Sequence, residues 1–202
     1  IMKKRFNTKQ LTLMGLLTGV LLLMAYTPLG YLNIGPLAIS LNMIPVAIGA
    51  VALGPGGGAF LGAVFGITSC LQCVGIGGTS AMGVILFEIN PVLTILQRFA
   101  TRVLAGALTG VVYRTLHKLH FQYGCHTAGF CAALFNTAFF MGALVLLFGN
   151  TPYLQNLIDG RNALVFVLSY VGINAFVELL ATTATVGVVC KALEKLKMIG
   201  GK

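Results

Sequence analysis

Residues 90–103 read NPVLTILQRFATRV, and this stretch decides which class of fold the chain can adopt. Asn90 can cap a first helical turn, and Pro91 suits the first helical position. The apolar run that follows continues to about residue 116, which is long enough to cross a bilayer. Yet Arg98 and Arg102, one helical turn apart, place two permanent charges inside it. The fold therefore has to provide partners for both charges at membrane depth.

The composition of the whole chain favours a membrane protein. Of its 202 residues, 57% are hydrophobic and 8% are charged, whereas soluble domains average about 25% charged residues. Apolar runs recur along the sequence, so we predict an all-α membrane protein, a single domain (1–202) built as a bundle of six transmembrane helices. The predicted spans are 10–27, 40–53 (short and broken by Pro45), 57–74, 91–116, 127–148 and 162–190, the last extending as a tail to Lys197.

The distribution of positive charge predicts the orientation in the membrane. The net charge is +9, but the cations flank apolar segments and do not form a surface for nucleic acid. The positive-inside rule then places both termini in the cytoplasm. The first apolar run has span length and no convincing cleavage site, so we expect a retained helix and not a signal peptide. Ten of the thirteen cations lie on the predicted inner side, namely Lys3, Lys4, Arg5, Lys9, Arg114, Lys118, Lys191, Lys195, Lys197 and Lys202.

Three longer connections, 27–40, 74–90 and 149–161, fall on the predicted outer side. They are rich in Gly, Pro and Asn, which redirect the chain, yet they are apolar enough to fold back on the protein. Long loops often carry binding functions. We therefore predict that these long outer loops roof an outward-opening pocket.

The charged residues at membrane depth are few, and each costs roughly 3 kcal/mol to insert unless it is paired or solvated. Arg98 lies about 12 Å below the start of its helix and Arg102 about 18 Å, on the same face. Glu178 is the acidic residue nearest this depth, so we predict a structural ion pair between Arg102 and Glu178. Arg98 then either snorkels or is solvated by water, or it faces an anionic ligand such as a carboxylate.

Neutral polar side chains at similar depth favour the ligand hypothesis. Gln97 lies beside the two arginines, and Asn136, Asn174 and Tyr170 occur in the last two spans. Each could instead form hydrogen bonds between helices, which is the more common role of a membrane Asn. Together they predict a binding site between the fourth, fifth and sixth spans.

Other chemistries find little support in the sequence. The motifs G-x-x-x-x-G-K-[ST], H-E-x-x-H and G-x-S-x-G do not occur, so we predict neither ATP hydrolysis nor enzyme activity, and no cofactor. Cys70 and Cys73 have C-x-x-C spacing without a second pair, and we expect the five cysteines to be mainly buried thiols. A metal site remains the less favoured alternative for the loop residues His117, His120, Cys125 and His126.

The segment 27–69, TPLGYLNIGPLAISLNMIPVAIGAVALGPGGGAFLGAVFGITS, together with the basic N-terminus and six spans, resembles the substrate-binding S components of energy-coupling factor (ECF) vitamin transporters. The fourth span, opened by NPV and carrying arginine, is most similar to the pantothenate S components. The resemblance implies a multi-pass protein of the bacterial cell membrane that binds its vitamin from outside. It also implies docking on a membrane scaffold subunit (EcfT) with two cytoplasmic ATPases, and delivery by tilting.

The resemblance further implies roles for individual residues. The carboxylate of pantothenate would pair with Arg98, while its amide and hydroxyls would meet Asn136, Asn174 and Tyr170. Loop residues that would help to close the pocket are Asn33, Gly35, Glu88 and Asn90. Riboflavin is the main alternative within the family, although it has no carboxylate for Arg98. A self-sufficient secondary carrier, with Glu178 as its coupling acid, is the alternative outside it.

Glycines at four-residue spacing predict close helix packing. Gly15 and Gly19 occupy the place of the Ala-x-x-x-Ala stripe that family members present to the scaffold, and we expect them to serve docking. The other stripes, which we expect to serve packing within the chain, are Gly58, Gly62 and Gly66, and Gly106 and Gly110.

Overall fold

The structure is a computed structural model that describes residues 8–27, 30–33, 38–78, 80–117 and 121–196. Within this part of the chain, five helices are long and apolar enough to cross a membrane. They are α1 (Thr8–Tyr26), α3 (Pro55–Leu71), which continues through a 3₁₀ turn to Val74, α5 (Pro91–Leu116), α6 (Phe121–Phe148) and α8 (Ala163–Lys195). The predicted helical, multi-pass membrane fold is therefore confirmed.

The second predicted span is shorter than expected. It corresponds to α2 (Met43–Leu53), whose 11 residues extend about 16 Å, roughly half the thickness of the hydrocarbon core. Pro45 does not break this helix, because it is the third helical residue and the first turn has no intrahelical bonds to lose. The predicted bounds of α5 are confirmed, whereas α6 begins six residues before the predicted 127.

The predicted long outer loops contain regular structure of their own. The first holds a hairpin in which β1 (Tyr31–Asn33) pairs antiparallel with β2 (Ala38–Ser40). The second holds the 3₁₀ turn η1 (Gln72–Val74) and α4 (Ala81–Ile89), and the third holds α7 (Pro152–Ile158). Ser80 and Thr151 begin α4 and α7 as side-chain N-caps, accepting from the backbone N–H of the residue three positions on.

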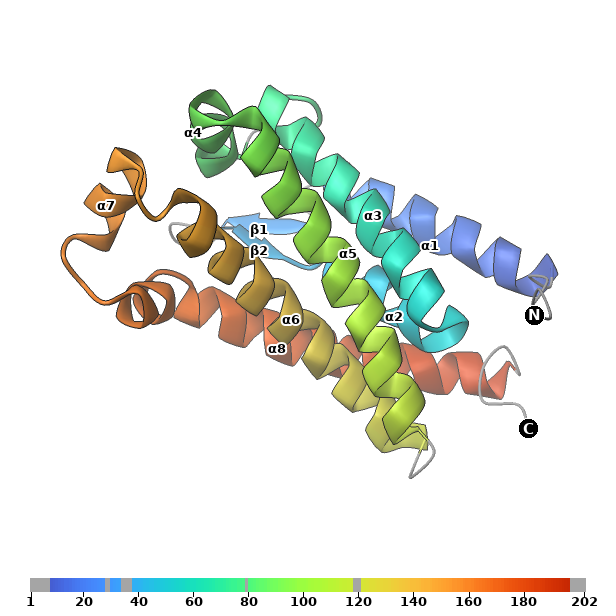
Figure 1. The fold of residues 1–202 in the computed structure, drawn as a ribbon. Helices are drawn as coiled ribbons and strands as arrows, with labels where there is room; N and C mark the ends of the chain where they lie inside the picture. Colours follow the sequence, from blue (N-terminus) through green and yellow to red (C-terminus); the bar gives the residue numbers. More distant parts are fainter. Residues whose placement is uncertain (1–7, 28–29, 34–37, 79, 118–120, 197–202) are drawn as a thin grey trace, which may run out of the picture.

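The two ends of the helix bundle differ in construction (Figure 1). The hairpin, α4 and α7 lie at one end. The start of α1, the α2–α3 turn, the end of α5, the start of α6 and the end of α8 lie at the other. The connections that the sequence assigned to the outer side are thus gathered at the opposite end from those assigned to the inner side.

Helices α3 and α5 approach each other closely through glycine. A Cβ on Gly58 would collide with the backbone carbonyl of Gly106, and one on Gly62 with that of Arg102. At Gly66 a Cβ would lie 3.0 Å from the Cα of Phe99. The predicted internal packing role of these stripes is confirmed, and this close contact fixes α5 against α3 over the turns that carry both arginines.

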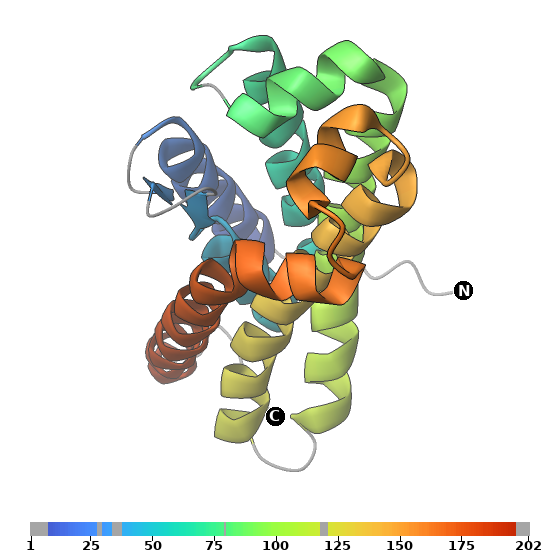
Figure 2. The same cartoon turned by 90° about the vertical axis from the view of Figure 1, so that its left-hand side faces the viewer.

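Viewed along the bundle from the end that carries α4 and α7, the long helices surround a shared interior (Figure 2). One buried apolar cluster includes residues of α1, α2, α3, α6 and α8, and a second lies where α4, α6, α7 and α8 meet. The outward faces are apolar as well, for example Leu146 of α6, which is 85% exposed. Such faces suit contact with lipid chains, and the polar groups described next lie inside.

Candidate substrate-binding site

Both arginines of α5 are buried inside the bundle. Arg98 is 4% exposed and Arg102 7% exposed. The alternative in which Arg98 snorkels to the surface is therefore wrong in this structure. The Asn90 cap and Pro91 start α5 as the sequence predicts, with Asn90 Oδ1 accepting from the N–H of Leu93 at 3.1 Å. This start sets the depth of both arginines.

Arg98 is held by neutral oxygens from two other elements. Its Nη1 donates to Ser69 Oγ of α3 at 2.9 Å and, more weakly, to the Ser69 carbonyl at 3.4 Å. Its Nη2 donates to Ser80 Oγ, the N-cap of α4, at 3.0 Å. The guanidinium lies directly under Gly83 of α4, where a Cβ would press on it. Arg98 Nε has no hydrogen-bond partner among the described residues.

Arg102 has a different environment from Arg98. Its Nη1 donates to the Arg98 carbonyl at 2.9 Å. Its guanidinium carbon lies 4.5 Å from the centre of the Phe65 ring and 5.0 Å from that of Phe140. Phe140 also lies 5.7 Å from the guanidinium carbon of Arg98. Cation–π contacts of this kind stabilise a buried cation in an apolar setting.

Glu178 and Asn136 form a buried hydrogen-bonded pair between α8 and α6. Asn136 Nδ2 donates to Glu178 Oε1 at 3.1 Å, and the two residues are 8% and 6% exposed. The predicted Arg102–Glu178 ion pair stays a prediction, and the structure adds Asn136 as the hydrogen-bond partner of the carboxyl.

Gln97 ties α5 to α6 in the same region. Its Nε2 donates to the Phe140 carbonyl at 3.2 Å, and the side chain is 1% exposed. Gln97 Oε1 and Asn136 Oδ1 are buried acceptors that lack hydrogen-bond partners in the described part of the chain. Because buried polar atoms are nearly always satisfied, these two oxygens mark places where a ligand donor would be stabilising.

The remaining predicted site residues differ from one another in burial and in their contacts. Asn174 is buried, one turn from Glu178 on α8. Glu88 is exposed in the last turn of α4, and Asn90 is engaged as a cap. Tyr170 lies in α8 and Asn33 in β1, but their side chains, like Gly35, lie outside the described residues.

Sequence reasoning missed four residues that surround the arginines: Ser69, Ser80, Phe65 and Phe140. Ser80 carried a signal, since a serine just before an apolar run predicts a helix N-cap. Phe65 and Phe140 carried none, because aromatic residues in an apolar span are indistinguishable from ordinary packing residues. Gln97 links α5 to α6 and Asn136 links α6 to α8, while Arg98 contacts α3 and the start of α4. The binding site that the sequence places between α5, α6 and α8 stays a prediction.

Other predicted features lie away from this region. Gly15 and Gly19 are exposed on α1, with open space where a Cβ would stand. Cys73, Cys125 and Cys190 are buried free thiols, whereas Cys70 and Cys131 are partly exposed. Among the described residues no group of three or more His, Cys, Asp or Glu is placed to hold a metal ion. His120 lies outside them.

Comparisons with known proteins agree on one family. The model of the family described as "ECF transporter, substrate-specific component" matches residues 9–189. The pantothenic acid transporter PanT of Lactococcus lactis subsp. cremoris is 27% identical over 176 residues, covering 80% of this chain and 83% of the relative. The pantothenate transporter PanT of Leuconostoc mesenteroides subsp. mesenteroides is 28% identical over 186 residues, covering 86% of each chain. The family match includes every residue of the buried polar region.

Proposed function

This chain belongs to the family of substrate-specific components of ECF transporters, and on this premise we propose that it binds pantothenate within the membrane, with Arg98 as the partner of the carboxylate. One observation carries the proposal: Arg98 is a buried cation whose Nη atoms contact only neutral serine oxygens among the described residues. Replacing those neutral acceptors with a carboxylate would supply the missing negative charge. Charge-assisted, bidentate bonds of this type are roughly twice as strong as neutral ones.

The rest of the vitamin fits the other groups of the site. Pantothenate carries an amide N–H and two hydroxyls, which can donate hydrogen bonds. Gln97 Oε1 and Asn136 Oδ1 are buried acceptors without partners among the described residues. A ligand with an acid at one end and donors along its length would therefore satisfy both kinds of group. The two curated relatives named for pantothenate support this choice of vitamin.

The proposal extends from binding to transport. The chain acts as one subunit of an ATP-driven importer, with α2 counted as a sixth, short span and both termini in the cytoplasm. It docks on the EcfT scaffold through the α1 face that carries Gly15 and Gly19, and two cytoplasmic ATPases in partner chains supply the energy. Two observations support this arrangement. The glycine face of α1 is open, and α1 begins at the same end of the bundle at which α8 ends (Figure 1).

Binding of radiolabelled pantothenate to the purified chain tests the proposed substrate. We expect Arg98→Ala to weaken binding by about 100-fold, because losing one partner of a buried charge pair costs upward of 2 kcal/mol. Panthenol, in which a hydroxymethyl group replaces the carboxyl, should lose far less affinity in the same variant. Arg161→Ala is the matched control, since Arg161 is half exposed and pairs with Asp159 at 3.9 Å.

Three results would contradict the proposal. If the wild type bound riboflavin but not pantothenate, the proposed vitamin would be wrong. Unchanged pantothenate binding by Arg98→Ala would remove the carboxylate role, even if the vitamin were correct. Uptake by the chain reconstituted alone, without scaffold and ATPases, would favour a secondary carrier. Arg98→Lys keeps a buried cation, so it serves as a second variant if Arg98→Ala fails to fold.

A further inference from the structure

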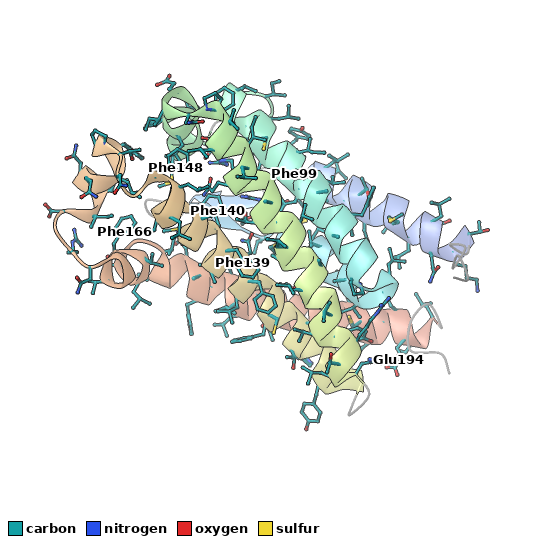
Figure 3. All side chains as sticks on the ribbon, viewed as in Figure 1. Phe99, Phe139, Phe140, Phe148, Phe166 and Glu194 are labelled. Atoms are coloured by element: carbon teal, nitrogen blue, oxygen red, sulfur yellow. The ribbon has the colours of Figure 1, made fainter. Side chains whose placement is uncertain are left out.

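The ring of Phe140 is shared by the two arginines of α5. Its centre lies 5.7 Å from the guanidinium carbon of Arg98 and 5.0 Å from that of Arg102. Phe65, by contrast, contacts Arg102: the centre of its ring lies 4.5 Å from the guanidinium carbon of Arg102. Figure 3 labels Phe140 on the stretch of α6 that passes α5, next to Phe139.

Two cations one helical turn apart repel each other, and burial strengthens that repulsion. The face of an aromatic ring carries partial negative charge, so one ring near both guanidinium groups lowers the cost of holding them together. A ring also uses none of the N–H donors. The Nη atoms of Arg98 therefore stay available for oxygen acceptors, at present those of Ser69 and Ser80.

The backbone at Phe140 is fixed as well. Gln97 Nε2 donates to the Phe140 carbonyl at 3.2 Å, which ties this turn of α6 to the turn of α5 that carries Arg98. Within helix α6 the carbonyl already accepts from its own helix, so the extra bond adds a cross-link between the two helices. Phe140 thus contacts α5 through its ring and through its backbone.

We propose that Phe140 is a positioning residue that holds the Arg98 guanidinium in the orientation needed to receive the ligand carboxylate. This inference rests on the proposed pantothenate site. The ring does not bond the vitamin in this scheme. It acts through Arg98, and its loss should therefore affect an acidic ligand more than a neutral one.

The first test compares two ligands in matched variants. Phe140→Leu, which removes the ring and keeps an apolar side chain, should weaken pantothenate binding about tenfold and leave panthenol binding nearly unchanged. Phe140→Tyr keeps the ring and should bind like the wild type. Phe139→Leu is the control, because the Phe139 ring stacks on Phe135 at 5.6 Å instead. Unchanged pantothenate binding in Phe140→Leu, or equal loss of both ligands, would overturn the inference.

The second test needs no ligand. In nitrogen–proton NMR spectra of the purified protein, the aromatic ring should displace the Nε–H resonance of Arg98, assigned through Arg98→Lys. Phe140→Leu should move that resonance toward an ordinary arginine position, and Phe139→Leu should not. If the wild type fails to bind pantothenate, the proposed function fails with its ligand, and this spectrum still tests whether Phe140 positions the Arg98 guanidinium. An Arg98 resonance unmoved by Phe140→Leu would then overturn it.

Discussion

At the scale of single residues, two identical side chains on one helix face have separate surroundings. Arg98 contacts hydroxyl and carbonyl oxygens of α3 and the α4 cap, while Arg102 lies between two aromatic rings. The sequence predicted such a division from the shortage of acidic residues at that depth. It could not name the partners, because Ser69 and Ser80 lie 29 and 18 residues from Arg98. Which face of α3 and which end of α4 meet α5 depends on how the helices rotate when they pack.

The predicted Arg102–Glu178 pair can be tested with Glu178→Gln. The glutamine keeps a side-chain oxygen that can accept from Asn136 but removes the negative charge. We expect the free energy of unfolding to fall by about 3 kcal/mol, because a buried cation loses its counter-charge. The measurement is equilibrium unfolding of the purified protein in mixed detergent micelles.

Asp159→Asn provides the comparison for Glu178→Gln. It removes the same charge from a pair in which the Arg161 and Asp159 side chains are 50% and 81% exposed, so its effect should stay below about 1 kcal/mol. Equally small effects of the two changes would rule out the ion pair. The rings of Phe65 and Phe140 and the Arg98 carbonyl would then remain among the groups that stabilise Arg102.

At the scale of helices, local signals predicted the long elements well and the short ones poorly. The Asn90 cap and Pro91 located the start of α5, since both act through neighbouring backbone groups. In contrast, α4, α7 and the hairpin were predicted as irregular loops. Helices of nine and seven residues are too short to be stable alone and form through tertiary contacts. The second buried cluster supplies such contacts for α4 and α7.

The glycine contact between α3 and α5 gives a prediction at this scale. Gly62→Ala places a methyl group against the Arg102 carbonyl, so the helices must separate. We expect a loss of about 1–3 kcal/mol in the free energy of unfolding and weaker pantothenate binding, because Ser69 moves away from Arg98 with α3.

Gly15→Ala is the control. Its methyl group meets open space, and alanine favours a helix over glycine by up to about 1 kcal/mol. An equally stable Gly62→Ala protein would show that the contact is less tight than described.

At the scale of the whole molecule, the polar site and the proposed docking face lie on different parts of the bundle. The polar groups of the proposed site belong to α3, α5, α6, α8 and the α4 cap, whereas Gly15 and Gly19 stand exposed on α1. Binding and docking should therefore be separable by mutation. The sequence predicted the polar residues on α5, α6 and α8 and both glycines of α1, but not Ser69 or Ser80, and only the packing of α1 shows which of its faces is left open.

Gly15→Trp tests that separation. The exposed position has open space where a Cβ would stand, so the folded chain can accept the indole, but the flat face needed for close helix contact is lost. We expect pantothenate binding by the purified variant to stay within about twofold of the wild type, a change of under 0.5 kcal/mol. ATP-dependent uptake by the variant, reconstituted with scaffold and ATPases, should fall to background.

Leu146→Trp is the control. Leu146 is 85% exposed on α6, a helix that packs mainly on α5 and α8 whereas α1 packs on α2 and α3, and the variant should keep both activities. Full uptake by Gly15→Trp would show that the docking face does not include this part of α1. Loss of pantothenate binding would show that α1 and the substrate site are coupled.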